Sequence, residues 1–307
     1  MAGLKELRTR IETIKSTQKI TSAMKMVAAS RLRRSQGLIS KCSFYHNNLI
    51  SCANRVIYEL REEENNTGTA VSYPKLMTGT GKDKTYLLLV FTSDRGLCGS
   101  YNANVAKVAM ARIEELLAQD KEVKVVCVGK KGRDIIKRKY AGLIVNTIEG
   151  VAKKGAKYYE GTDIAYPVLE AYEKGEIDVC EVVVSHFRSA INREVKCKQL
   201  LPMKMENFDN NNRLSFRTNV VRGAFYEYEP GKLELLSGML PLIFRESVFQ
   251  AIVHSQASEH GARMTSMDNA TRNAKEMISK LTLKYNGIRQ SAITTELIEI
   301  ISGAEAL

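Results

Sequence analysis

Tryptophan is absent from the 307 residues, and proline occurs only five times. None of the prolines lies in the first 60 residues, and none follows Pro241. Because proline interrupts helices, both ends of the chain are open to long ones. Aromatic residues make up only 7% of the sequence, which leaves few platforms on which the bases of a single-stranded nucleic acid can stack.

Cysteine and histidine patterns typical of metal sites and disulfide frameworks are missing as well. The sequence has no Cys-x-x-Cys pair and no histidines at metal-ligand spacing. Its six cysteines and four histidines are scattered along the chain: Cys42, Cys52, Cys98, Cys127, Cys180, Cys197, His46, His186, His254 and His260. We therefore expect free thiols in a reducing compartment and no bound metal or cofactor. The N-terminus lacks the apolar segment of a secretory signal, and we expect no segment long and apolar enough to span a bilayer.

Basic residues are concentrated at the N-terminal end. The chain holds 46 Lys and Arg against 34 Asp and Glu, a net charge of +12. Residues 1–41 carry ten basic and two acidic side chains, whereas the residues from Arg245 to the C-terminus carry seven of each. The N-terminal segment is therefore expected to face an acidic partner, and the C-terminal segment a different one.

Apolar residues recur at heptad-like spacing near both ends of the chain. The N-terminal stripe is Leu4, Leu7, Ile11, Ile14, Ile20, Met24 and Val27. The C-terminal stripe is Met267, Ala270, Ala274, Met277, Leu281, Ile288, Ala292 and Leu297, with Ile278, Tyr285 and Ile301 beside it. The pattern predicts one helix to about Leu60 and another from near Pro241 almost to Gly303, packed as an antiparallel coiled coil. Small residues would let the two axes approach closely, namely Ala23, Ala270, Ala274 and Ala292.

Between these helices, apolar strands alternate with helices. The segments are TYLLLVFT, a helix over about 102–118, VKVVCVG, a helix over 131–139, GLIVNT, a helix over about 161–173, VCEVVVSHF and EVKCKQLLPM. Such alternation predicts a mostly parallel sheet covered on both faces. The fold class is therefore α/β, a long antiparallel α-helical coiled coil formed by the N- and C-terminal helices with an inserted Rossmann-like α/β domain. The expected boundaries are 1–65 and 218–307 for the segments that form the coil, and 83–205 for the domain.

One turn in this domain resembles a phosphate-binding loop. SDRGLCGSYN, residues 93–102, directly follows the first apolar strand, but it lacks the third glycine of a dinucleotide-binding motif. GTGKDKT, residues 79–85, fails the Walker pattern and precedes the strand that it should follow. We predict a structural turn in which Gly96 and Gly99 take tight dihedrals, and Ser100 or Asn102 caps the next helix.

Several longer stretches carry a family resemblance. TQKITSAMKMVAAS, SDRGLCGSYN, ASEHGARMTSMDNATRNA and LTLKYNGIRQSAITTELIEIISGAEAL resemble, in this order, the gamma subunit of F-type ATP synthase. The resemblance implies a rotor shaft without catalytic residues, turning inside a ring of three alpha and three beta subunits. It also implies contacts with the c-ring and the epsilon subunit, and no nucleotide in the middle domain.

The resemblance further implies roles for individual residues. Met24, Lys25 and Arg263 match positions where the shaft meets an acidic loop of a beta subunit. Arg289, Gln290, Thr294 and Glu296 match positions that engage a second beta-subunit loop. The family has a foot segment that touches the c-ring, and here it falls at the start of 218–307. Its matching residues in this sequence are Tyr226, Glu229 and Pro230.

Two departures and two alternatives accompany the resemblance. The chloroplast form carries a close cysteine pair, whereas this sequence has only Cys180 and Cys197, on two predicted strands, so redox switching is not expected. The lack of a transit peptide favours the cytoplasmic face of a bacterial inner membrane over the mitochondrial matrix face. The alternative functions are a nucleotide-dependent enzyme built on the middle domain and a coiled-coil protein that binds nucleic acid through its basic N-terminal segment.

Overall fold

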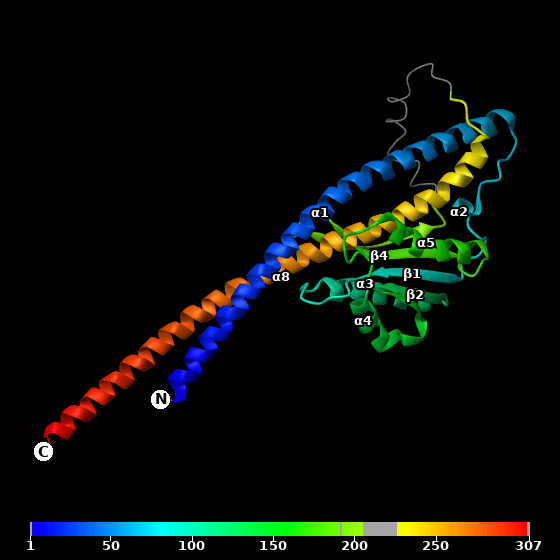
Figure 1. Cartoon of the computed structure of the whole chain (residues 1–307). Helices are drawn as coiled ribbons and strands as arrows, with labels where there is room; N and C mark the ends of the chain where they lie inside the picture. The colour runs from blue at the N-terminus through cyan, green and yellow to red at the C-terminus, as the bar shows by residue number, and fades with distance from the viewer. Residues whose placement is uncertain (1, 191, 205–225, 306–307) are drawn as a thin grey trace. The chain divides into compact units, whose positions relative to one another are not determined.

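A computed structural model describes residues 2–190, 192–204 and 226–305. Its contacts divide the chain into two units, which we call the two-helix unit, Met1–Ser30 with Arg263–Leu307, and the sheet unit, Arg31–Ala262. Two long helices, α1 (Ala2–Thr67) and α8 (Lys232–Glu305), each contribute to both units (Figure 1). The expected fold class is confirmed. The start of the expected C-terminal segment, residues 218–225, lies outside the described residues.

Both long helices extend further than the sequence pattern indicates. α1 continues seven residues past Leu60 and ends at Thr67, before Gly68, whose φ is 68°. α8 begins at Lys232, so Pro241 lies inside the helix and does not mark its start. The reason is packing, because Leu236 and Leu240, on the N-terminal side of the proline, are completely buried in the sheet unit.

The two-helix unit is an antiparallel pair with a partly polar seam. Thr271 Oγ1 donates to Thr21 Oγ1 at 2.8 Å, and Lys25 Nζ lies 2.6 Å from Asp268 Oδ1. Polar side chains thus occupy part of the contact that the sequence pattern assigned to apolar residues. Five residues of the expected stripes are exposed, namely Ile20, Val27, Met277, Ile288 and Leu297, and so is Ala23.

The sheet unit contains five strands in the order β3-β2-β1-β4-β5. All neighbouring pairs are parallel except β4 and β5, which are antiparallel. The elements are α2 (Lys75–Thr78), β1 (Thr85–Phe91), α3 (Tyr101–Leu117), β2 (Glu122–Val128), α4 (Lys130–Tyr140), η1 (Ala141–Leu143), β3 (Ile144–Ile148), α5 (Tyr158–Glu173), β4 (Val179–Phe187) and β5 (Arg193–Leu201). The prediction of a mostly parallel, doubly wound sheet is confirmed.

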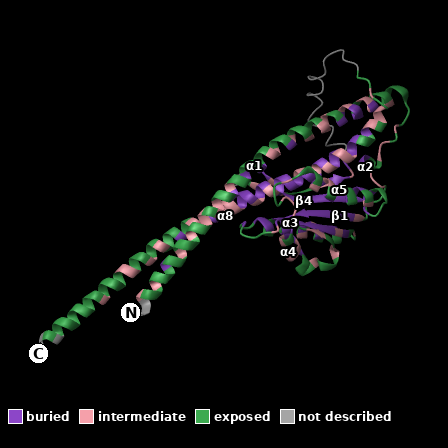
Figure 2. Ribbon diagram, in the orientation of Figure 1, coloured by how far each residue is buried: buried purple, intermediate pink, exposed green. Residues whose placement is uncertain are grey.

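Alternate residues of the central strands pack on opposite faces of this sheet, as strand geometry requires. Leu87, Leu89 and Phe91 of β1 belong to an apolar cluster with α1, α5 and α8, whereas Leu88 and Val90 face α3 and α4. All members of both clusters are buried, and Figure 2 shows the central strands in the colour of buried residues. The result is a three-layer unit in which the sheet lies between two sets of helices.

The apolar character of α8 corrects one expectation from the sequence. By length and composition alone, a segment within Lys232–Ser302 is apolar enough to cross a bilayer, with a mean hydropathy of 1.3. However, 56% of that window is buried within the protein. The apolar residues of this helix include core residues such as Phe244 and Val248, so burial in the fold accounts for much of its hydropathy.

Candidate interaction surfaces

The turn after β1 is occupied by the chain's own side chains. Asp94 accepts the backbone N–H of Lys130 at 3.0 Å through Oδ1 and that of Gly150 at 2.7 Å through Oδ2. The next two amides of α4 donate to the Ser93 carbonyl and to Thr92 Oγ1, each at 3.0 Å. Backbone amides at a helix N-terminus are groups that bind phosphate in many nucleotide-binding domains.

The start of α4 approaches this turn so closely that it needs glycine. A Cβ on Gly129 would lie 2.4 Å from the Thr92 carbonyl oxygen, and a Cβ on Gly132 would lie 2.5 Å from Thr92 Oγ1. Gly129 also has a φ of 107°, which favours glycine. The carboxylate of Asp94 therefore stands where an anionic ligand would otherwise meet the helix, and it compensates the partial positive charge of the helix end.

The sequence prediction for this turn is only partly right. Gly99 has a positive φ of 57°, but the second left-handed residue of the turn is Leu97, at 64°, and not Gly96. Neither expected cap forms, because Ser100 makes no side-chain cap, and Asn102 Oδ1 instead accepts the Ser93 N–H at 2.9 Å. Asn102 thereby ties the turn to the first residues of α3.

The residues assigned to the first beta-subunit contact all lie in the two-helix unit. Met24, Lys25 and Arg263 are half-buried. The hydrogen bond from Lys25 lowers the pKa of the Asp268 carboxyl, which also lies 3.2 Å from Arg272 Nη2. Lys25 thus already has an acidic partner within the chain, while Ile20, Met26 and Val27 leave apolar surface on the same helix, 54% or more exposed.

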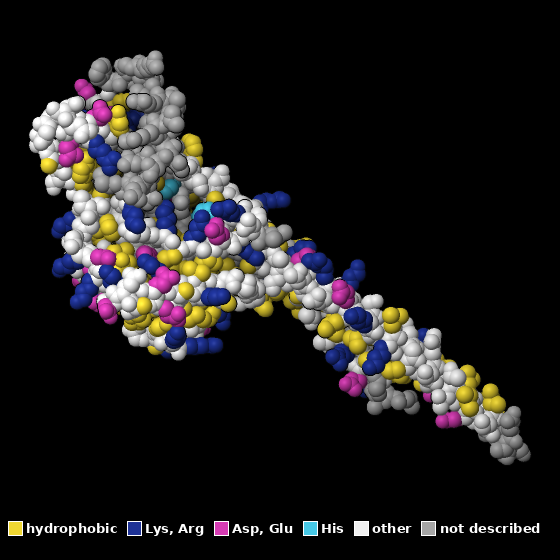
Figure 3. All heavy atoms as spheres, turned by 180° about the vertical axis from the view of Figure 1, so that it is seen from behind, with side chains coloured by type: hydrophobic (Ala, Val, Ile, Leu, Met, Phe, Trp, Pro, Cys, Tyr) yellow, Lys and Arg dark blue, Asp and Glu magenta, His cyan; other side chains and the backbone are white. Residues whose placement is uncertain are grey.

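The residues assigned to the second beta-subunit contact are fully on the surface. Arg289, Gln290, Thr294 and Glu296 are all exposed, and Thr294 Oγ1 donates to the Gln290 carbonyl at 2.9 Å. The antiparallel register places the start of α1 beside about the turn of α8 that holds Arg289, so the last turns of α8 extend beyond α1 (Figure 1). Exposed apolar side chains continue along this end of α8 (Figure 3), namely Leu283, Ile288, Ile293, Leu297, Ile298, Ile300 and Ile301.

The foot residues Tyr226, Glu229 and Pro230 are exposed and lie in the sheet unit. The Tyr226 ring lies 4.3 Å from the guanidinium carbon of Arg55. Close by, the Tyr228 hydroxyl donates to Glu59 Oε1 at 2.6 Å, and both burial and this bond raise the pKa of Tyr228. Lys232 contacts Glu59 and Glu63 of the same helix, so the foot is fastened to α1 on both sides of Glu229.

Sequence reasoning missed two groups of buried ionisable side chains. Glu246 is only 2% exposed, its Oε1 has no hydrogen-bond partner, and burial raises its pKa to about 7. His186 and His254 stack with their ring centroids 4.0 Å apart, and burial lowers the pKa of His254 to about 4. A polar residue in an apolar stretch was the available signal for Glu246, whereas the histidine pair arises from distant parts of the chain.

The architecture defines a class of protein, one whose terminal helices pair antiparallel and whose sequence between them holds a doubly wound domain. The ATP synthase family profile matches residues 3–307. The ATP synthase gamma chain of Sinorhizobium medicae is 43% identical and that of Rhodospirillum rubrum 44% identical, each covering 100% of both chains. The chain belongs to the ATP synthase gamma chain family.

Solved structures show the same fold. A chain of the Tetrahymena thermophila mitochondrial ATP synthase, from a structure of its central stalk and c-ring, has a TM-score of 0.56 at 25% identity and covers 82% of this chain and 99% of its own length. A chain of the Euglena gracilis mitochondrial ATP synthase rotor also has a TM-score of 0.56, at 16% identity and 95% and 99% coverage.

Proposed function

We propose that this chain is the central-shaft rotor subunit of an F-type ATP synthase. The observation that carries the proposal is the exposed apolar end of α8, where Ile298, Ile300 and Ile301 are each at least 57% exposed. Large exposed apolar surface on a protein indicates a partner that covers it. The beta and alpha subunits, arranged as a ring around this end of the helix, are the partners that fit a gamma chain.

The mechanism follows from the lack of three-fold symmetry in a single chain. Such a shaft presents a different face to each of three beta subunits, and each face favours one conformation only through a differential contact energy. Rotation then changes which catalytic site is open. Protons that cross the membrane supply about 2.3 kcal/mol per charge per 100 mV, and the shaft transmits that work from the c-ring.

The individual contacts follow the same proposal. Met24, Lys25 and Arg263 meet one acidic beta-subunit loop, and Arg289 with Gln290, Thr294 and Glu296 meets another. Tyr226, Glu229 and Pro230 rest on the polar loops of the c-ring, and the sheet unit also binds the epsilon subunit. The fastening of the foot by Tyr228 and Lys232 supports this assignment, since a segment that passes on torque must be held to the shaft.

We further propose that the chain carries out no bond chemistry itself. The internal hydrogen bonds of Asp94 support this, because one of them occupies the Lys130 amide, the first backbone amide of α4, which could otherwise bind a phosphate group. The nucleotide-dependent enzyme therefore has less structural support than the rotor.

As a peripheral subunit the chain would lie at the cytoplasmic face of a bacterial inner membrane, with the mitochondrial matrix face as the alternative.

The test is a charge reversal at the foot in the assembled complex. Glu229→Lys is expected to uncouple proton pumping from ATP hydrolysis in membrane vesicles, while the detached catalytic head still hydrolyses ATP. Glu173→Lys, at an exposed position of α5, is the matched control and should pump normally. Normal pumping by the Glu229 variant would remove this residue from the c-ring contact. Failure of the tagged chain to co-purify with alpha and beta subunits would overturn the rotor assignment.

A further inference from the structure

Two adjoining cavities lie at the carboxyl ends of the sheet strands. The first, of about 410 Å³, is lined by the turns that follow β1 and β2, by the loop after β3, and by parts of α1 and α8 within the sheet unit. The second, of about 300 Å³, shares Arg31, Lys153, Gln256 and His260 with the first. Doubly wound sheets bind their ligands at the carboxyl ends of their strands, so the position is one where a ligand is expected.

Cationic side chains from three separate segments line these cavities. Arg31 and Arg34 come from α1, Arg95 comes from the turn after β1, and Lys153 and Lys154 come from the loop after β3. Among the residues that the structure describes, none of the five forms a salt bridge. The acidic side chains of the lining are Asp94 and Glu259, and the carboxylate of Asp94 already accepts two backbone amides.

The wall between the two cavities is held in a fixed arrangement. Gln256 Nε2 donates to the Ala152 carbonyl at 2.8 Å, and its Oε1 accepts the Ser35 hydroxyl at 3.2 Å. This glutamine therefore joins α8 to α1 and to the loop that carries Lys153 and Lys154. Because the backbone that carries the cationic side chains is held by these hydrogen bonds, less conformational entropy is lost when the side chains order around a ligand.

We propose that these cavities bind a small anion that carries several phosphate groups. Five cations without acidic partners match a ligand with multiple negative charges, and a volume of about 410 Å³ has the scale of a small-molecule site. A concave site of this size favours a compact phosphate chain over an extended acidic peptide. The backbone cradle at α4 is closed by Asp94, so recognition would rest on Arg and Lys side chains.

The source of the phosphate groups is an inorganic polyphosphate or the phosphate chain of a nucleotide, and both share the same recognition chemistry. Binding here involves no hydrolysis and is separate from the rotor role, so the two proposals fail independently. An anion at this place would join α1 and α8 to the loops of the sheet within one unit. The expected consequence is a more stable sheet unit when the anion is present.

The experiment is calorimetric titration of the isolated full-length chain at low salt with tripolyphosphate, ATP and orthophosphate in parallel. We expect saturable binding of tripolyphosphate at one site, and weaker binding of orthophosphate. Comparable affinity for ATP would identify the phosphate chain as the recognised group, and much tighter binding of ATP would identify a nucleotide as the source. Arg95→Ala with Lys153→Ala should raise Kd at least tenfold, and Lys153→Arg alone should preserve it within about threefold.

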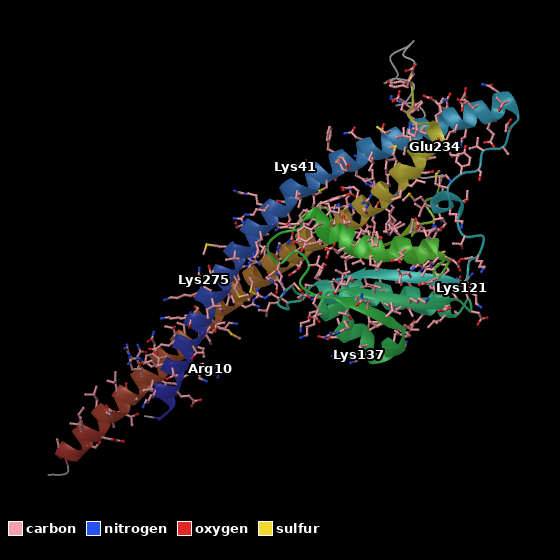
Figure 4. The ribbon with its side chains drawn as sticks, turned by 45° about the vertical axis from the view of Figure 1, so that its right-hand side comes forward. Arg10, Lys41, Lys121, Lys137, Glu234 and Lys275 are labelled. Carbon is pink, nitrogen blue, oxygen red and sulfur yellow. The ribbon has the colours of Figure 1, made fainter. Side chains whose placement is uncertain are left out.

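The matched control is Lys137→Ala. Lys137 is an exposed lysine in the last turn of α4, on the side of the sheet opposite to α1 and α8 (Figure 4). Its removal should leave Kd within about twofold. The proposal is overturned by undetectable tripolyphosphate binding at millimolar concentration, by equal losses in the control and the double variant, or by binding of polyglutamate in place of tripolyphosphate.

Discussion

The two units of this protein differ in how much of their apolar surface they bury themselves. In the sheet unit both faces of the sheet are covered, and large side chains such as Phe91, Tyr172 and Phe244 are almost completely inaccessible. In the described part of the two-helix unit, the buried apolar residues are Ile11, Ala28, Met267 and Ala274. The sheet unit thus contains a core of its own, whereas the two-helix unit leaves much of its apolar surface exposed.

Because of this difference, the same kind of apolar residue contributes to different properties in the two units. A leucine in the sheet unit stabilises the chain by being removed from water. Leu297, at 54% exposure, contributes little of this kind until a partner covers it. Substitutions that measure stability in one unit should therefore measure assembly in the other, and the following predictions test that division.

The largest effect is expected from a core truncation in the sheet unit. Phe244→Ala removes a side chain that is 1% exposed and should lower the free energy of unfolding by about 3–5 kcal/mol. Leu297→Ala should change it by less than about 0.5 kcal/mol in the isolated chain. Chemical denaturation followed by circular dichroism measures both. A comparable loss in the Leu297 variant would mean that the two-helix unit buries this residue by itself.

A second effect concerns the buried carboxyl of Glu246 and depends on pH. Its folded pKa of about 7 lies above that of an unfolded chain, so the folded state holds the proton more tightly. Stability from this group is therefore fully present below about pH 4.5 and is lost as the pH rises to about 7, by about 3 kcal/mol. Glu246→Gln should flatten this slope.

The measurement for Glu246 is a series of unfolding curves between pH 5 and 8. Glu173→Gln serves as the control, because Glu173 is exposed in α5 and should leave the slope of the natural chain unchanged. An identical pH dependence in the Glu246 variant and the natural chain would show that this carboxyl does not titrate in the folded state near neutral pH.

A smaller effect, confined to the complex, is expected at the end of α8. Arg289→Leu with Gln290→Ala should slow ATP turnover of the assembled complex at least about tenfold, which corresponds to about 1.4 kcal/mol. The isolated chain should keep its stability, because both side chains are exposed. Turnover assays on the purified complex decide the matter. An assembled complex with full activity would reduce these residues to ordinary helix surface.

The smallest effect is expected in the polar seam. Thr21→Val leaves the Thr271 hydroxyl without this acceptor and should cost about 0.5–1 kcal/mol. Thr21→Val combined with Thr271→Val should cost less than either single change, because two apolar groups of similar shape then face each other. Thermal unfolding of the three variants gives the comparison. Additive losses would indicate that the two threonines act independently.

Much of the fold could be predicted because the central strands are nearly continuous apolar runs. Segments such as TYLLLVF have no other stable place than the middle of a covered sheet, and their alternation with helices indicates parallel pairing. The seam of the two-helix unit was harder to predict. Its contacts pair Thr21 with Thr271 and Lys25 with Asp268, so a count of apolar residues placed Ile20 and Val27 in the wrong position.

The site-level details depend on contacts that join distant residues. The Asp94 carboxylate accepts hydrogen bonds from backbone amides 36 and 56 residues later in the sequence. No local sequence pattern predicts either bond. The caps expected from Ser100 and Asn102 failed for the same reason, because Asn102 has a partner in the preceding turn that competes with capping. The roles of Arg289 and Tyr226 depend on other subunits and remain predictions.

The closure of the turn by Asp94 has a consequence for what holds this part of the sheet unit together. A doubly wound domain that needs a nucleotide to order its loops is firm only while that nucleotide is abundant. Here a carboxylate that belongs to the chain accepts hydrogen bonds from the start of α4 and from the loop after β3, at 3.0 and 2.7 Å. This connection needs no ligand, so it holds the start of α4 to the loop after β3 whether or not a nucleotide is present.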